Sequence, residues 1–222
     1  MLEGRPEMGV ITAEWRKLWL PGLWLVAAVT TGCSWLLAAM MSGPRGAEQT
    51  LQLVPRFAAL GLILLGVMAA TGEYAGRQVL TTCAAMPCRA QVGVAKLATA
   101  AGALLAAALV AVLGLWLLAG AGEWRLPGAA AYLVAMGLLG YAIGLVLRQL
   151  VPALTTALVF LVVLPPMLLP YTRLASWLPG AAGADLFAAS PEHPVMQSAT
   201  ALAGWVALLW LTALVTWARR DA

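Results

Sequence analysis

Six long apolar runs divide the sequence, and this spacing constrains the fold more than any other feature. Most of the runs approach the roughly 20 residues that an α-helix needs to cross a bilayer core. Backbone polar groups in lipid must bond within their own segment, so each run is expected to be helical. The expected spans are Leu20–Met41, Phe57–Thr71, Leu97–Ala121, Ala129–Leu147, Val151–Leu169 and Ala199–Trp217. The second of these is short, unless it is buried among its neighbours or extended by Leu53 and Val54.

The composition excludes an ordinary soluble domain. Hydrophobic residues make up 63% of the chain and charged residues 10%, against about half and a quarter in soluble domains. The spans use up nearly all of the 222 residues, which predicts a single all-α transmembrane domain over residues 1–222. Arg16 and Lys17 precede the first run as in a signal peptide. That run exceeds a signal core and more spans follow it, so we expect it to be retained.

The basic residues predict the orientation of the six spans. An even number of spans places both termini on one side, and that side carries nine of the thirteen Lys and Arg residues. The positive-inside rule therefore places both termini in the cytoplasm. No basic residue falls within a predicted span. If the orientation is right, a cysteine that replaces Gly180 should be labelled from outside intact cells, and one near Arg89 should not. The nine are Arg5, Arg16, Lys17, Arg77, Arg89, Lys96, Arg148, Arg219 and Arg220, and the other four are Arg45, Arg56, Arg125 and Arg173.

Three connections are expected outside the cell: Ser42–Arg56, Gly122–Gly128 and Pro170–Ser198. The last is the longest, and it mixes large apolar residues such as Trp177 and Phe187 with Pro and Gly. This mixture predicts an extracellular loop over residues 170–198 that contains short interfacial helices.

Two features within the spans predict local geometry. Pro165 and Pro166 lie near the outer end of the fifth span, where a missing N–H and a ring clash should kink or break the helix. A packing kink and a moving gate both fit this pattern. Gly140 and Gly144 form a Gly-x3-Gly pair on the fourth span, which favours close helix packing.

The segment before the first span has an amphipathic pattern over residues 9–19. Apolar residues recur at helical spacing, and the charged residues take the other face. This pattern predicts an N-terminal interfacial elbow helix that lies in the membrane surface, with a simple charged flank as the alternative. The apolar face is Ile11, Trp15, Leu18 and Trp19, and the charged residues are Glu14, Arg16 and Lys17.

The richest cytoplasmic segment covers residues 73–89, between the second and third spans. Glu73 and Arg77 stand four residues apart, in the favourable order for a helical ion pair. Val79, Leu80 and Met86 would give a short helix its apolar contacts. Pro87 should then end that helix, and Arg89 leads back to the membrane. Such a helix could transmit force from a soluble partner, or it could be an ordered loop without one.

The sequence offers little other site chemistry. Cys83 and Cys88 share a loop, but His193 is far away and Cys33 lies in the first span, so we expect no metal site. The two lysines lie in no Gly-x4-Gly-Lys-Ser/Thr phosphate loop, which predicts that the chain does not hydrolyse ATP by that means. Paired intramembrane carboxylates and serine-nucleophile motifs are also missing.

Two stretches resemble a known family of membrane proteins. The pattern Gly-Glu-Tyr-x-x-Arg…Leu-Thr-Thr…Pro-x-Arg…Lys-Leu, from Gly72 to Leu97, resembles the coupling segment of type-2 ABC exporter permeases. Glu14-Trp-Arg-Lys-Leu18 resembles their N-terminal elbow helix. The chain departs from many relatives at Gly76, which precedes Arg77, and at Cys88 between Pro87 and Arg89.

The resemblance implies the permease subunit of an ATP-driven exporter in a bacterial cell membrane. Its partners would be a separate ABC ATPase, which binds ATP and Mg²⁺, a second permease subunit, identical or not, and membrane lipid. The implied cargo is hydrophobic or amphipathic, such as a drug, a peptide antibiotic or a lipid-linked molecule. No cofactor in this chain and no nucleic-acid partner is expected. The alternatives are a non-transporting immunity or assembly subunit, and an intramembrane enzyme, which would need reactive polar groups within its spans.

Overall fold

The computed structural model describes residues 21–41, 47–75, 89–119 and 125–220, with side chains over 25–40, 48–72, 98–117 and 125–216. The predicted elbow helix at residues 9–19 lies outside the described residues. Most of the predicted coupling segment, residues 76–88, also lies outside them.

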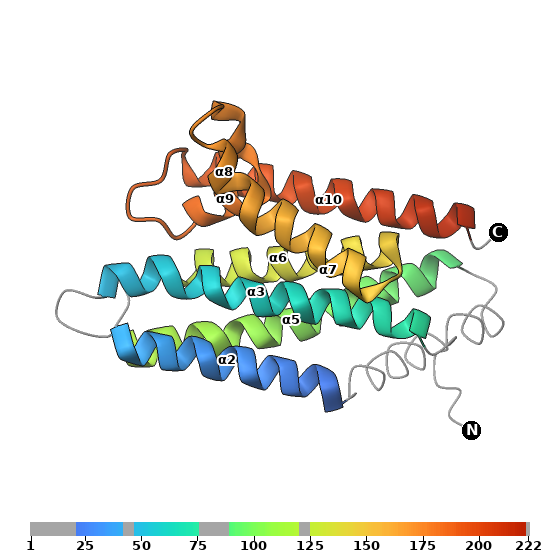
Figure 1. Ribbon diagram of the computed structural model, residues 1–222, viewed down its shortest axis with the longest axis horizontal. Helices are drawn as coiled ribbons and strands as arrows, with labels where there is room; N and C mark the ends of the chain where they lie inside the picture. Colours follow the sequence, from blue (N-terminus) through green and yellow to red (C-terminus); the bar gives the residue numbers. More distant parts are fainter. Residues whose placement is uncertain (1–20, 42–46, 76–88, 120–124, 221–222) are drawn as a thin grey trace, which may run out of the picture.

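The described chain is helical and holds no strand, which confirms the all-α prediction at this level. Five of its helical stretches are long and apolar enough to cross a membrane, and Leu25–Met40 is a shorter apolar helix. The length and the apolar composition of these helices thus indicate a membrane protein. Figure 1 shows the elements: α2 (Pro21–Met41), α3 (Ala47–Ala75), α5 (Arg89–Ala119), α6 (Leu126–Leu147), α7 (Leu150–Leu158), the π-helical η1 (Val159–Val163), α8 (Leu164–Leu168), the 3-10 helix η2 (Arg173–Trp177), α9 (Pro179–Asp185) and α10 (Val195–Arg220).

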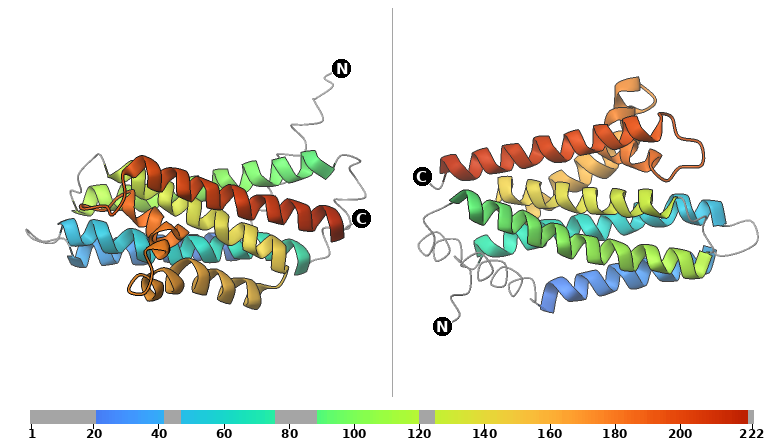
Figure 2. Two further views of the ribbon diagram at one scale, coloured as in Figure 1. Left: turned by 90° about the horizontal axis from the view of Figure 1, so that it is seen from above. Right: turned by 180° about the vertical axis from the view of Figure 1, so that it is seen from behind.

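The helices run back and forth between two ends of one elongated bundle (Figures 1 and 2). One end, here called the base, holds Ala75 of α3, Arg89 of α5, Arg148 after α6 and the end of α10. At the opposite end, beside α8 and the start of α10, lie η2, α9 and the turns around them, residues 171–194, here called the cap. The helices therefore alternate in direction as the sequence predicts.

Helix α6 is the centre of the bundle and packs against α3, α5, α7 and α10. Its packing on α3 is close because glycines remove side chains from the contact. A Cβ on Gly66 of α3 would lie 2.2 Å from the carbonyl oxygen of Gly137, and one on Gly140 would lie 2.8 Å from that of Ile63. A Cβ on Gly144 would lie 2.7 Å from the Cβ of Ala70. The role predicted for Gly140 and Gly144 is thereby confirmed.

The predicted start of the second span is wrong. Residues 47–56 were expected in an external connection, but they form the first turns of α3. Thr50, Leu51 and Val54 are buried on one face, so packing holds these turns helical despite polar neighbours and Pro55. The candidate span becomes Glu48–Gly72, which includes Arg56. The predicted span began one residue after Arg56, whereas the apolar helical stretch extends past it on the N-terminal side.

The two prolines at the outer end of the fifth span distort the helix without breaking it. The N–H of Leu164 bonds to Val159, five residues back, so η1 makes a π turn before Pro165. Prolines at 165 and 166 leave the carbonyl of Leu161 without a donor in either the α or the π pattern. Gly180 of α9 packs directly there, since a Cβ on it would lie 2.1 Å from the Leu161 oxygen. Gly180 is therefore a poor position for a labelling cysteine.

The first helix is fixed to the bundle by one large side chain. The Trp35 ring lies against Gly114 of α5, where a Cβ would come within 1.9 Å of the indole nitrogen. The Trp35 Nε1–H donates to the carbonyl of Val110 at 3.1 Å. Helix α2 thus packs on both α3 and α5. It has no extensive contact with α7, so the side of α2 towards α7 is open.

Candidate functional site

The base of the bundle holds both ends of the predicted coupling segment. Glu73 lies in the last turn of α3, and Arg89 is the first residue of α5. The other predicted residues of this segment lie outside the described residues: Arg77, Val79, Leu80, Met86 and Pro87.

The two helices that flank this segment are longer than a bilayer core requires. Helix α3 has 29 residues and α5 has 31. At 1.5 Å per residue they are about 43 and 46 Å long, against a core of about 30 Å. Charged residues enter α5 only in its first turns, at Arg89 and Lys96. The described part of α5 therefore has the length to carry its N-terminal turns past the apolar layer at the base.

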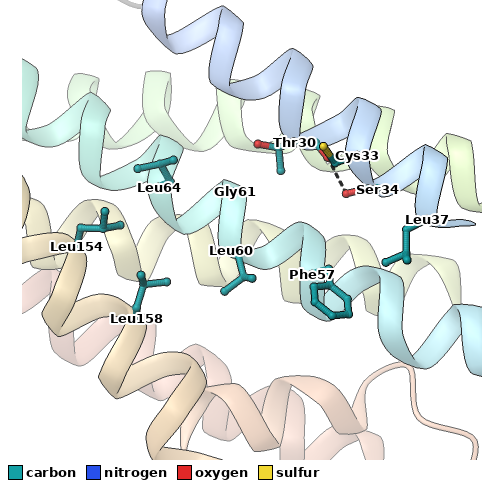
Figure 3. A pocket seen from close by; sticks show the side chains of 10 residues that line it. All are labelled: Thr30, Cys33, Ser34, Leu37, Phe57, Leu60, Gly61, Leu64, Leu154 and Leu158. Carbon is teal, nitrogen blue, oxygen red and sulfur yellow. Dashed lines mark hydrogen bonds between the residues drawn. The ribbon is translucent and has the colours of Figure 1, made fainter.

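An open apolar groove runs between α2 and α7 (Figure 3). Helix α3 forms its floor, because α3 packs against both walls. The groove has a volume of about 550 Å³, within the range of about 300–1,000 Å³ that small-ligand sites occupy. It is lined by Thr30, Cys33, Ser34 and Leu37 of α2, Phe57, Leu60, Gly61 and Leu64 of α3, and Leu154 and Leu158 of α7.

The few polar groups of the groove are already satisfied. The Thr30 hydroxyl donates to the carbonyl of Val26 at 2.5 Å, and the Ser34 hydroxyl donates to that of Thr30 at 2.8 Å. Both bonds stay within α2, as is usual for hydroxyls in membrane helices. Cys33 is an exposed thiol. The groove therefore offers a ligand mainly apolar contact.

The cap holds two short helices, η2 and α9, in the connection where the sequence predicts short interfacial helices. Asp185, at the end of α9, is buried and accepts two hydrogen bonds. One comes from the backbone N–H of Glu192 and one from the hydroxyl of Ser198, both at 3.2 Å. This carboxylate ties α9 to the turn before α10 and to α10 itself. Phe187 is buried, and its ring packs at a tilt of 51° against Tyr132 of α6, with ring centroids 5.2 Å apart.

A second set of contacts closes the cap around His193. Its Nε2 lies 2.8 Å from the hydroxyl of Ser176, and its ring stacks on Trp177 with centroids 4.4 Å apart. The carbonyl of Trp177 accepts from the indole of Trp205 on α10 at 2.8 Å. Sequence reasoning predicted the short helices here but missed these pairings, since they join residues far apart in the chain.

The Ser176 and His193 pair lacks the geometry of a nucleophilic site. The Ser176 hydroxyl donates to the carbonyl of Arg173 at 2.7 Å, so its oxygen accepts from the Nε2–H of His193. In the described cap, the Asp185 carboxylate accepts from Glu192 and Ser198 and not from His193, so it does not orient the imidazole. A general base needs the nucleophile's proton in reach and an orienting partner behind it. These contacts stabilise the cap.

Within the described residues, no three of the side chains that bind metals gather in one place. Cys83 and Cys88 lie outside those residues. No family model matches the chain, and no curated protein is detectably similar to it.

Proposed function

We propose that this chain is the membrane-spanning permease subunit of a type-2 ABC exporter. It would act with a separate ATPase that binds ATP and Mg²⁺, and with a second permease subunit. Its cargo would be a hydrophobic or amphipathic molecule that follows an apolar path through the membrane.

One observation carries the proposal. The chain leaves the bundle after α3 and returns at α5 on the same end, and the intervening residues carry the Gly-Glu-Tyr…Pro-x-Arg pattern. The two helices concerned are longer than the apolar layer, which would let them transmit movement from a docked ATPase into the bundle. In particular, α3 forms the floor of the groove, so a movement of Glu73 in its last turn would be passed along α3 to the groove.

The proposal includes six spans, with both termini at the cytoplasmic face. Helix α2 would be the first span, because it runs alongside α3 and α5 and has 21 residues. The base would then face the cytoplasm, which agrees with the basic residues at 89, 96, 148, 219 and 220. The cap would face outward.

An immunity or assembly subunit remains the competing function, because it could carry the same segment and the same bundle. ATP-driven transport by purified components separates the two. An intramembrane enzyme is disfavoured by the arrangement of Ser176, His193 and Asp185 in the described cap.

A single charge in the coupling segment tests the proposal. Leu80→Asp would place a carboxylate where an apolar anchor should be buried against the ATPase, and desolvation would oppose docking. We expect copurification of the ATPase and ATP-driven transport to fall at least about tenfold, since a lost anchor costs about 2 kcal/mol or more. The permease itself should still insert.

The matched control is Gln78→Asp, which adds the same charge two residues away at a position that is not a predicted anchor. It should leave ATPase binding near that of the unchanged chain. Equal ATPase recovery and transport from the Leu80→Asp chain would exclude this segment as the coupling element.

A further inference from the structure

Residues 164–220 form a packing unit of their own, here called the α8–α10 module, which contains α8, η2, α9 and α10. Within it, α9 packs against the other three elements. Hydrogen bonds join the same elements, because Ser198 donates to Asp185 and Trp205 donates to the carbonyl of Trp177. Among the described elements outside it, the module packs extensively only on α6 and η1, along one side of the bundle (Figures 1 and 2). Helix α6 is therefore the surface on which the module rests.

The chain enters this module through η1, where the helical hydrogen bonds are incomplete. The N–H of Leu164 donates to Val159, so the carbonyl of Phe160 loses the donor that an α-helix would give it. The carbonyl of Leu161 faces Pro165 and Pro166, neither of which has an N–H. Helix α7, before this segment, packs on α3 and α6, whereas α8, after it, packs on η1 and the cap. The segment thus joins two separate packing units, and few backbone bonds resist bending there.

One glycine holds the module against the bent segment. The Leu161 oxygen lies 2.1 Å from where a Cβ of Gly180 would stand, so a Cα–H of this glycine points at the oxygen in that place. A Cα–H···O contact stabilises by less than an N–H···O bond does. The module is therefore held at this point by a weaker interaction than the helical bonds that the prolines removed.

The contact of the module with α6 contains a buried donor without an acceptor. Trp210 of α10 is 6% exposed, and its ring stacks on Tyr141 of α6 with centroids 5.5 Å apart and an interplanar angle of 14°. In the part of the chain that the structure describes, its Nε1–H has no hydrogen-bond partner. Burying a donor in this way disfavours the arrangement that buries it. Near the cap the same contact is favoured, because Phe187 packs on Tyr132.

We propose that the α8–α10 module rocks on α6 about a joint at residues 159–166, and that the described arrangement is one of two. In the other, Gly180 has left the Leu161 oxygen, and α10 has shifted on α6 and taken the Trp210 N–H out of its unpaired position. Leu158, which lines the groove, directly precedes the joint, so the movement reaches the groove wall. That ATP drives this movement rests on the proposed function; the movement itself does not.

The test measures distances between two spin labels on the purified full-length chain by pulsed electron paramagnetic resonance. The three native cysteines are replaced, and the chain is kept in an uncharged maltoside detergent. One pair of labels joins the module to the bundle, at the exposed positions Leu174 and Leu36. The control pair lies within the module, at Leu174 and the exposed Leu208. We expect two distances for the first pair and one for the second; a single distance for the first pair, no broader than that of the control, would overturn the proposal.

Substitutions in the contact with α6 should shift the ratio of the two arrangements in opposite directions. Trp210→Phe removes the unpaired N–H and should raise the share of the described arrangement, relative to the other, at least about fivefold. Phe187→Leu removes the ring contact with Tyr132 and should lower that ratio about fivefold. Trp177→Phe is the matched control, because this ring stacks on His193 within the module and should leave the ratio unchanged. Shifts of the same sign in the first two variants, or none, would contradict the proposal.

Replacing the prolines tests the position of the joint. Pro165→Ala combined with Pro166→Ala returns two N–H donors to the segment, which should stiffen it and leave one distance between module and bundle. Pro152→Ala is the matched control, because Pro152 lies in the first turn of α7, where an N–H has no helical acceptor. It should retain both distances. Both distances in an unchanged ratio in the double alanine chain would exclude this joint. The assay contains no ATPase, so the Leu80→Asp experiment can fail while the movement stands, and the reverse.

Discussion

At the scale of single residues, the contact between α3 and α6 depends on a missing Cβ. Gly66 faces backbone atoms of α6, with the Gly137 oxygen 2.2 Å and the Tyr141 nitrogen 2.9 Å from where a Cβ would stand. Backbone atoms in a packed helix cannot move aside as a flexible side chain can. The two helices must therefore separate if a methyl group is added.

Gly66→Ala should accordingly destabilise the protein, by about 1–3 kcal/mol or more. Gly72→Ala on the same helix is the matched control, because nothing lies within 4 Å of its added Cβ. That change should be neutral or stabilising by up to about 1 kcal/mol, since alanine favours helix. Thermal unfolding of both variants in detergent measures the difference. A Gly66→Ala protein as stable as the Gly72→Ala protein would contradict the close packing.

Arg148 ends α6 in a left-handed conformation, with φ of 58°. Its N–H donates to the carbonyl of Gly144 at 2.8 Å. Glycine normally occupies this left-handed position at a helix C-terminus. Arg148→Gly and Arg148→Ala both remove the guanidinium, so their difference isolates the backbone. The glycine variant should be more stable by about 1 kcal/mol, measured as the higher midpoint of thermal unfolding. Equal midpoints would mean that no strain is present.

At the scale of elements, the sequence predicted the helices better than their beginnings. The end of α6 at Leu147 agrees with the prediction, because Arg148 and Gln149 interrupt a uniformly apolar run. The start of α3 was misplaced because polar residues and Pro55 end the apolar run there. The buried positions Thr50, Leu51 and Val54 carry a helical spacing that would have identified these turns.

Contacts between elements were largely beyond prediction. Pro165 and Pro166 predicted a distortion of the helix. The π form of this distortion and its contact with Gly180 depend on α9, which comes later in the chain. The coupling residues Arg77 to Pro87 stay predictions.

The cap provides a prediction at this scale. Asp185→Ala removes both acceptors that hold α9 to the start of α10, at a cost of about 1–3 kcal/mol for buried donors left unpaired. Hydrogen exchange of the amides in residues 173–194 should become faster. Glu192→Ala is the matched control, because its backbone N–H still donates to Asp185. Slow exchange in both variants would show that the carboxylate does not hold the cap.

At the scale of the whole molecule, the bundle gives the orientation a sharper test. Gly180 is unsuitable for labelling because α9 packs there against Leu161, whereas Leu174 is 77% exposed on the cap. In a background with Cys33, Cys83 and Cys88 replaced, a cysteine at Leu174 should react with an impermeant maleimide on intact cells. A cysteine at Arg89 should react only after the membrane is opened. The reverse pattern would place the cap in the cytoplasm.

The central claim is that the bundle is the permease of an ATP-driven exporter, and its own copurifying partners test that most directly. The tagged, unmutated chain is extracted in a mild detergent, and the associated proteins are identified and counted by mass spectrometry. The account predicts an ATPase that contains a Gly-x4-Gly-Lys-Ser/Thr loop, in a one-to-one ratio with permease subunits. Recovery of a folded chain with no such ATPase would contradict it.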